Sequence, residues 1–452
     1  MKVDRIEIRN YKGFENCDVD FHPNVNVFIG SNASGKTTLL TAIVKSLFSI
    51  TKRFTEGSAG GNLALTNSDI NYRSLFTYIK TDYSNFPETD NIKFSSFIQS
   101  GIITEDAKNK SKDVTVKLNE FVHRINNIIG TTSMTIPIVK FYPANRVSLF
   151  RTTDNFSDRI PKVFKIAQLE TWSNIYHNNL SYSNFSKWFI ENENNELRLQ
   201  REYRNFDLES PSLKSIRIAL SKTFELLNFG QYKVISKEFK REGSSKLTTT
   251  LVLLNLQTNL EEDINNKSDG EKAIITLIAD IAYNLSIAKN FVMDDDFLKS
   301  PGVVMIDEIE THLHPKWQRE ILPILTTIFP NIQFFVATHS PQIVASVPSD
   351  CVFVCDNFNV EKVHLKTLGE DTNSLLKFIF EATERPKPYI ELIEQIDSLI
   401  DNNAQIEKIQ TVINKIIDLY NEDKNISISN LIDDLNIRLS AYKFEKEYEK
   451  DR

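Results

Sequence analysis

Residues 30–37 of this 452-residue chain read Gly30-Ser31-Asn32-Ala33-Ser34-Gly35-Lys36-Thr37. They match the pattern G-x-x-x-x-G-K-[ST], in which glycines let the backbone turn so tightly that its N–H groups approach phosphate oxygens. A strand pattern over residues 24–29 precedes the loop, and an apolar helical pattern over residues 38–48 follows it. A helix that begins at such a loop points its positive end toward the anion. The stretch therefore predicts a phosphate loop between a strand and a helix, at the centre of an α/β fold.

The side chains of this loop predict a site for ATP and Mg²⁺. We expect Lys36 to reach the β and γ phosphates and the Thr37 hydroxyl to ligate Mg²⁺. The other loop residues and Thr38 are expected to line the phosphates. The alternative is a glycine loop with an incidental lysine, and the flanking strand and helix argue against it.

A second motif lies far downstream, where an apolar strand pattern over residues 303–306 ends in Asp307 and Glu308. Burial of the strand would fix both acids at its carboxyl end. We expect Asp307 to hold Mg²⁺, directly or through water, and Glu308 to orient and polarise the attacking water. The alternative is a strand that ends in a solvated acidic turn. The phosphate loop in the same chain argues against this alternative, because the two motifs occur together in ATP sites.

A lone histidine follows the next apolar strand pattern, in the stretch Thr338-His339-Ser340-Pro341. Lone histidines are usually structural. This one follows Asp307 by about one strand–helix–strand unit, which is the place of a switch histidine that contacts a γ-phosphate. We therefore predict His339 as a catalytic residue beside Glu308 and Lys36.

The stretch Ser268-Asp269-Gly270-Glu271 opens an apolar helical pattern. A serine at the N-cap and a glutamate three residues later form a capping box, which is the structural interpretation. In the functional interpretation, the Ser268 hydroxyl and the backbone N–H of Gly270 bind the γ-phosphate held by a second copy of the chain. Both interpretations can hold together, because a capped helix start is also an anion site.

Composition narrows the class of protein. The formal net charge is −7 and 41% of the residues are hydrophobic, enough for a large α/β domain with an appendage. Three cysteines, an odd and sparse set, favour a reducing compartment such as the cytoplasm. No apolar run is long enough for a membrane span, and residues 1–5 lead directly into a strand pattern, so we expect neither a membrane span nor a signal peptide. The mildly acidic net charge gives no reason, by itself, to expect nucleic acid binding.

The patterns divide the chain into an α/β domain over residues 1–370 and a helical region over residues 371–452. Short apolar runs in the first part are typical of a buried parallel or mixed sheet. Residues 150–230 are polar and aromatic with helical spacing, and they predict a helical insertion. The apolar stripes of residues 371–452 are expected to pack on each other or on a partner.

The four motifs together resemble the ABC-type ATPase superfamily, in its RecF, OLD and Rad50-like branch. The resemblance covers about residues 1–370 and is strongest in residues 307–315 and 337–341, with residues 8–14 as a typical opening. It implies a P-loop NTPase core and a head-to-tail dimer, in which the loop of one copy faces Ser268 and Gly270 of the other. Asp269 departs from the double glycine of transporter signatures.

Within that branch, residues 368–376 and 384–386 look like the ATPase subunit of Septu defence systems, the PtuA-like family, including retron-associated forms. This likeness implies an antiphage ATPase that controls a separate HNH-type nuclease, with DNA or another nucleic acid as a further partner. One alternative is a RecF-like repair or recombination ATPase without a nuclease, and another is a binding module with slow or no turnover. The helical tail is too short for a Toprim nuclease domain.

Other clusters receive structural interpretations. Cys351 and Cys355 are expected to pack in the core, and the stretch Met293-Asp294-Asp295-Asp296 is expected to form a solvated loop. Two groups of basic residues have two interpretations, a solvated surface or a contact with the DNA backbone. The groups are Arg198, Arg201 and Arg204, and Lys237, Lys240, Arg241 and Lys246.

Overall fold

The computed structural model describes residues 1–56, 64–87, 89, 92–129, 134–144, 167–173, 175, 181–227, 230–240, 247–290, 292, 296–379, 387–402, 404–423 and 426–450. The chain forms two compact units, Met1–Leu375 and Leu376–Arg452. The sequence prediction placed its boundary near residue 370. None of the described helices is both long and apolar enough to cross a membrane.

A six-stranded mixed sheet forms the centre of the first unit. Its order is β13(Asn359–Lys362), β12(Val352–Asp356), β3(Val25–Ile29), β11(Ile332–Ala337), β10(Gly302–Asp307) and β6(Ile138–Tyr142). All pairs are parallel except β12 with β13. Every residue of β3, β10 and β11 is buried, which explains their continuous apolar runs. The α/β fold class is therefore confirmed.

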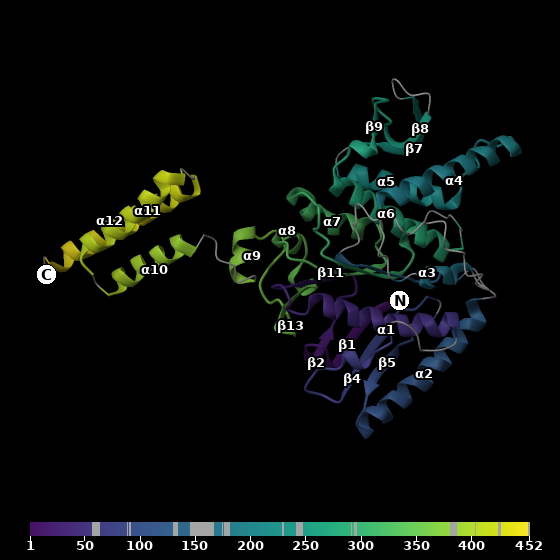
Figure 1. Cartoon of the computed structure of the whole chain (residues 1–452), viewed down its shortest axis with the longest axis horizontal. Helices are drawn as coiled ribbons and strands as arrows, with labels where there is room; N and C mark the ends of the chain where they lie inside the picture. The colour runs from purple at the N-terminus through teal and green to yellow at the C-terminus, as the bar shows by residue number, and fades with distance from the viewer. Residues whose placement is uncertain are drawn as a thin grey trace. The chain divides into compact units, whose positions relative to one another are not determined.

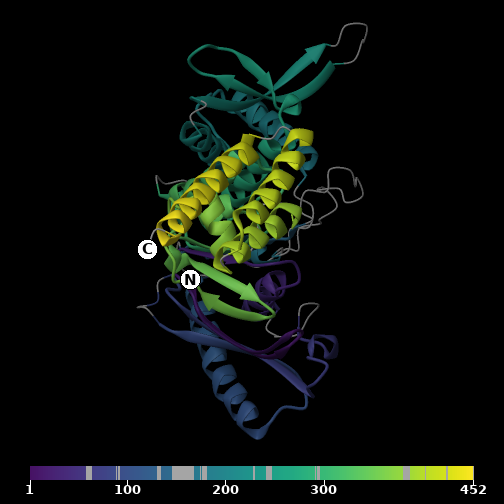
Figure 2. The same ribbon diagram turned by 90° about the vertical axis from the view of Figure 1, so that its left-hand side faces the viewer.

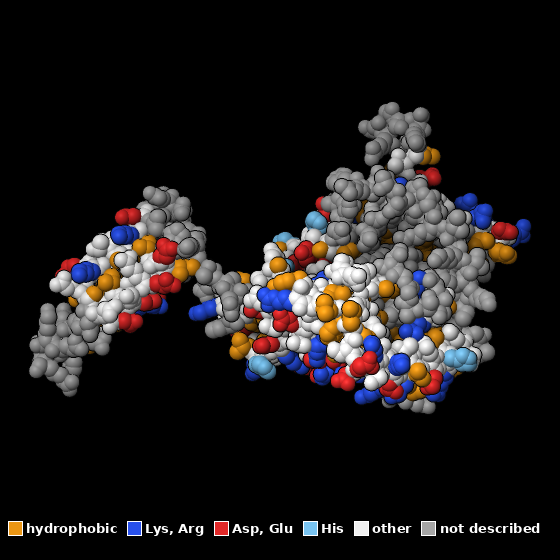
Figure 3. Space-filling view, turned by 60° about the horizontal axis from the view of Figure 1, so that its bottom comes forward, with side chains coloured by type: hydrophobic (Ala, Val, Ile, Leu, Met, Phe, Trp, Pro, Cys, Tyr) orange, Lys and Arg blue, Asp and Glu red, His pale blue; other side chains and the backbone are white. Residues whose placement is uncertain are grey.

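A second sheet is antiparallel and lies on the other side of helix α1(Lys36–Glu56) (Figure 1). It contains β2(Phe14–Asp20), β1(Lys2–Tyr11), β4(Phe76–Ser84) and β5(Phe94–Gly101). Helix α2(Glu105–Ile129) packs on β5. Apolar side chains of both sheets, α1 and α2 share one core cluster, so α1 is fixed from both sides. Figure 3 views this end of the molecule, where side chains of both charge signs are interspersed.

The segment between β6 and β10 adds helices and a small sheet. The helices are α3(Glu170–Ser173), α4(Tyr182–Tyr203), α5(Pro211–Leu226) and α6(Asp269–Ala288), and the strands are β7(Tyr232–Lys240), β8(Leu247–Asn255) and β9(Glu261–Asp263). Figure 2 shows the β7–β9 sheet beyond α4 and α5, away from the central sheet. Parts of the predicted insertion over residues 150–230, namely residues 150–166, 174, 176–180 and 228–229, lie outside the described residues. The described part contains the helices α3, α4 and α5.

Three further helices follow β10: α7(Pro315–Ile328), α8(Pro341–Val344) and α9(Thr372–Phe378). Short 3-10 turns occur at Asn67–Asp69, Ala167–Leu169, Ile264–Asn266, Phe297–Lys299 and Ser349–Cys351. The second unit contains α10(Lys387–Asp401), α11(Ile406–Asp423) and α12(Ile426–Lys450). These three helices share a core of their own, which includes Ile396, Ile413 and Leu435.

Strand register determines which loops meet. Asp307 at the end of β10 pairs with Ala337 at the end of β11, and Ala337 pairs with Phe28 near the end of β3. Because the carboxyl ends of parallel strands lie at one edge of the sheet, the loops after these three strands are neighbours. That edge is the place where an open α/β sheet binds its ligands.

Candidate functional site

The phosphate loop connects β3 to α1. Gly30 and Gly35 both have positive φ angles, 148° and 109°, as the motif requires. A Cβ atom on Gly30 would lie 2.0 Å from the carbonyl oxygen of Cys355, so any larger residue would displace the neighbouring strand β12. Backbone geometry and packing thus both demand glycine at this turn.

Lys36 is the first residue of α1 and is almost fully buried. Its ammonium group donates to the carbonyl oxygens of Gly30 at 2.9 Å and Ser31 at 2.7 Å. Burial lowers the pKa of Lys36, and nearby groups that include Asp307 and Glu310 oppose this effect. Lys36 is therefore held inside the phosphate loop, and the carboxylates at the end of β10 and in the loop after it are close enough to affect its charge.

Thr37 and Asp307 come from motifs 270 residues apart and are in direct contact. The Thr37 hydroxyl donates to Asp307, with oxygen–oxygen distances of 2.9 Å to Oδ2 and 3.2 Å to Oδ1. A hydroxyl beside a carboxylate is the donor set that Mg²⁺ takes next to a nucleotide. These residues therefore fit the predicted metal position.

Glu308 begins the loop after β10, which we call the acid loop, residues 308–314. Its φ of 49° is in the left-handed region, which costs of order 1 kcal/mol for a residue with a side chain. Thr311 donates from Oγ1 to the Glu308 carboxylate at 3.4 Å. The left-handed turn directs the chain away from the strand immediately after Asp307, so the two acids occupy different environments at the sheet edge.

The loop after β11, which we call the histidine loop, residues 338–340, is tied to the acid loop by Glu310. The backbone N–H of His339 donates to Oε1 of Glu310 at 2.5 Å, and the Thr338 hydroxyl donates to Oε2 at 2.8 Å. Sequence reasoning missed Glu310. The available signal was an acid three residues after Asp307, beside a loop that leaves the neighbouring parallel strand.

Ser268 and Gly270 lie at the start of α6, and the capping box is present. The Ser268 hydroxyl accepts from the Glu271 backbone N–H, and the Glu271 carboxylate accepts from the Ser268 N–H at 2.8 Å. Gly270 is buried, and a Cβ atom there would lie 2.3 Å from the carbonyl oxygen of His312 in the acid loop. Within the described part of one chain, no hydrogen bond or ion pair joins Ser268 to the phosphate loop.

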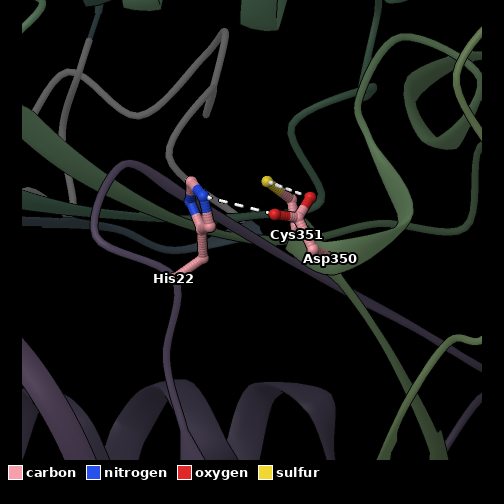
Figure 4. Close-up of side chains that lie close together, drawn as sticks. All are labelled: His22, Asp350 and Cys351. Carbon is pink, nitrogen blue, oxygen red and sulfur yellow. Dashed lines mark hydrogen bonds and ion pairs between the residues drawn. The ribbon is translucent and has the colours of Figure 1, made fainter.

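One other cluster of potential metal ligands occurs among the described residues, formed by His22, Asp350 and Cys351 (Figure 4). The His22 Nε2 atom lies 3.6 Å from the Asp350 carboxylate. However, His22 Nδ1 accepts from the backbone N–H groups of Asn24 and Val25, at 3.2 and 3.4 Å. The proton of the neutral ring is therefore on Nε2, which faces the cluster as a donor and not as a metal ligand. Burial also raises the pKa of Cys351 to about 12, so we interpret the cluster as structural.

The remaining sequence candidates form no part of the proposed nucleotide contacts. Arg198, Arg201 and Arg204 are exposed on and just after α4, and Lys237 pairs with Glu261 between β7 and β9. Arg241, Lys246 and residues 293–295 lie outside the described residues. Cys351 and Cys355 are both buried, although Cys351 precedes β12 and only Cys355 belongs to the strand.

Comparisons with known proteins agree with this geometry. A family model described as "AAA domain, putative AbiEii toxin, Type IV TA system" matches residues 25–345. The chain is 28% identical to the Retron Ec83 probable ATPase of Escherichia coli, over 88% of this chain and 80% of that protein. It is 26% identical to the Retron Vc95 probable ATPase of Vibrio cholerae, over 90% of this chain and 84% of that one. It is also 29% identical to the Septu protein PtuA of Bacillus mycoides, over 34% of this chain and 24% of that protein.

Proposed function

The chain belongs to the AAA-domain family whose model spans residues 25–345, and on that premise we propose that it hydrolyses ATP with Mg²⁺ at the shared edge of β3, β10 and β11. Its family and its relatives make it an ATPase, which binds a nucleotide. The observation that carries the proposed site is the contact between Thr37 and Asp307, because it unites two motifs that lie far apart in the sequence.

Each residue of this edge has a role that its position supports. Backbone N–H groups of residues 30–38 and the Lys36 ammonium would hold the phosphates, while Thr37 and Asp307 would hold Mg²⁺. When bound, Mg²⁺ neutralises charge on the phosphate oxygens. Glu308 would orient a water molecule and take its proton, and His339 would contact the γ-phosphate.

The proposed active assembly is a head-to-tail dimer of two copies. Ser268 is exposed at the positive end of the 20-residue helix α6, which favours an anion at this end. In the single chain the Ser268 hydroxyl donates to the Glu271 carboxylate at 2.8 Å, so it would turn from Glu271 toward the γ-phosphate of the second copy when the dimer closes. ATP bound between two copies would favour the closed dimer, and hydrolysis would release it.

Replacement of Glu308 by Gln tests the site and the dimer together. The variant should retain ATP and accumulate as dimer, because the amide keeps the size of the side chain but cannot take a proton. ATP turnover and the molar mass with ATP, from light scattering, are the measurements. Glu361→Gln, at an exposed acid on edge strand β13, is the control and should behave as the unchanged protein. Normal turnover by Glu308→Gln would refute the assignment of the base.

Replacement of Lys36 by Ala tests the phosphate loop. Loss of the ammonium should weaken ATP binding by about 10-fold or more, because a charge-assisted contact to phosphate contributes roughly 1.5–3 kcal/mol. Titration calorimetry with ATP measures this directly. Lys52→Ala, at another lysine of α1, serves as the control. Unchanged affinity in Lys36→Ala would contradict the proposed phosphate contact.

We further assign the ATPase to antiphage defence, as the subunit that controls a separate HNH-type nuclease. This assignment is supported by the similarity to two retron ATPases over most of the chain and to a Septu protein over a third of it. Co-purification with the products of neighbouring genes tests it. A nuclease that copurifies and changes its activity with ATP would support the assignment, and isolation of the ATPase alone from its native operon would oppose it.

A further inference from the structure

The Glu310 carboxylate receives two donors from a single loop. Its Oε1 atom accepts from the His339 backbone N–H at 2.5 Å, and its Oε2 atom accepts from the Thr338 hydroxyl at 2.8 Å. Hydrogen bonds to an ionised carboxylate are roughly twice as strong as bonds between neutral groups. This one side chain therefore fixes both the backbone and a side chain of the histidine loop.

Its position in the fold explains why this contact matters for the proposed site. Glu310 lies three residues after Asp307, whereas Thr338 directly follows Ala337, the register partner of Asp307. The Thr338 N–H also donates to the Phe28 carbonyl at 3.0 Å, near the end of β3. The histidine loop is thus bound on one side to the strand before the phosphate loop and on the other to the acid loop.

A second chain of hydrogen bonds strengthens the same junction. Thr338 Oγ1 accepts from the Ser340 N–H at 2.9 Å, and the Ser340 hydroxyl donates to Gln318 Oε1 at 2.6 Å. The Gln318 side-chain amide in turn donates to the Leu313 carbonyl at 2.9 Å. The acid loop is consequently connected to the histidine loop at two points, directly at Glu310 and through Gln318 at Leu313.

The geometry points to positioning and not to proton transfer. Each Glu310 oxygen already accepts from the histidine loop, while Glu308 is the acid that directly follows the Asp307 position. A small displacement of a group that contacts the reacting phosphate is enough to slow chemistry by about 100-fold. A carboxylate that fixes such a group has a large effect without touching the nucleotide.

We propose that Glu310 is a positioning residue. It holds His339 in a fixed position relative to Asp307 and Glu308, so that loss of Glu310 slows ATP turnover by displacing His339. This inference rests on the proposed ATPase site. It adds a link between the two catalytic loops of one chain, carried by a side chain outside the four sequence motifs.

The test is a double-mutant cycle with Glu310→Ala, His339→Ala and the double variant. Steady-state turnover gives kcat and KM for ATP, and the midpoint of thermal unfolding reports folding. Glu310→Ala should lower kcat by about 10- to 100-fold and change KM by less than about threefold, because binding through the phosphate loop is retained. The double variant should be within about twofold of His339→Ala, since two residues that act as a unit are not additive.

Two conservative variants guard against misfolding. Glu310→Gln keeps one acceptor oxygen, and Thr338→Val removes only the hydroxyl, so both should have kcat values between those of the unchanged protein and Glu310→Ala. If the kcat losses multiply in the double variant, or if Glu310→Gln and Thr338→Val turn over normally, the proposal is overturned. If His339→Ala turns over normally while Glu308→Gln is inactive, the histidine assignment and this proposal fail but the ATPase site stands. If Glu308→Gln is also fully active, the proposed function itself fails.

Discussion

Gly270 illustrates how a single residue serves packing and chemistry at once. The predicted role of Gly270 is a backbone N–H for a phosphate, and alanine would keep that N–H. However, a Cβ atom would lie 2.3 Å from the His312 carbonyl oxygen, closer than such contacts occur. Glycine at this position is therefore required by the close approach of α6 to the acid loop, whatever anion the helix binds.

We expect Gly270→Ala to lower the free energy of unfolding by about 1–3 kcal/mol, the usual range for an overpacked site. ATP turnover should fall as well, because the displaced acid loop carries Glu308 and Glu310. Urea denaturation and turnover assays measure the two effects. Ser268→Ala is a comparison for the free energy of unfolding only, because it removes an exposed helix cap at a cost of about 1 kcal/mol and also removes the hydroxyl proposed to contact the second copy's nucleotide. Equal stability of Gly270→Ala and the unchanged protein would contradict the packing argument.

At the scale of elements, a buried ionic network joins α4, α5 and β7. Arg217 on α5 donates to Glu196 at 2.7 Å and to Glu193 at 2.8 Å, both on α4. Glu193 also accepts from the Ser236 N–H of β7, and Glu196 accepts from the Ser210 N–H, both at 2.6 Å. Burial would lower the pKa of Arg217, but the two carboxylates outweigh it and raise the pKa. The network thus fixes the insertion as one body.

Removal of the cation from this network should be strongly destabilising. Arg217→Met would leave two buried carboxylates without their partner, at a cost of about 3–5 kcal/mol in the free energy of unfolding. Arg198→Met, at an exposed arginine of α4, is the control and should stay within about 0.5 kcal/mol. Chemical denaturation followed by circular dichroism measures both variants. A loss below about 1 kcal/mol for Arg217→Met would contradict the network's contribution.

How far sequence predicts this molecule depends on whether a feature is local. The strand, loop and helix around Lys36 follow from adjacent residues, and buried strands β10 and β11 follow from continuous apolar runs. Glu310 was missed because its partners lie 28 and 29 residues later, and its place three residues after Asp307 does not by itself show which loop it contacts. The sequence likewise did not predict that Glu193 and Glu196 form a buried network, although their helical spacing places them on the buried face of α4 with Phe189.

At the scale of the whole molecule, the two units have separate cores. The predicted apolar stripe of α10 packs within its own unit: Ile396 is buried, and Ile393 and Leu399 pack against the same cluster. That stripe is therefore already covered by α11 and α12. A partner of this unit would therefore bind its outer surface, where Ile437 and Phe444 on α12 are 69% and 72% exposed.

Because the two units have separate cores, we expect that truncation can separate ATP binding from partner binding. A chain that ends at residue 375 keeps the phosphate loop, both catalytic loops and the core around α1, so its ATP affinity should match that of the full chain within about twofold. We propose the second unit as the docking element for the nuclease of the proposed function, because its outer surface exposes Ile437 and Phe444, and we therefore expect the truncated chain not to retain that nuclease. Calorimetry with ATP and co-purification from the native operon are the two measurements. Ile437→Asp in the full chain is the milder companion, since a charge on an exposed residue leaves the core of the unit intact. Retention of the partner by the truncated chain would place docking on the ATPase unit and contradict the prediction.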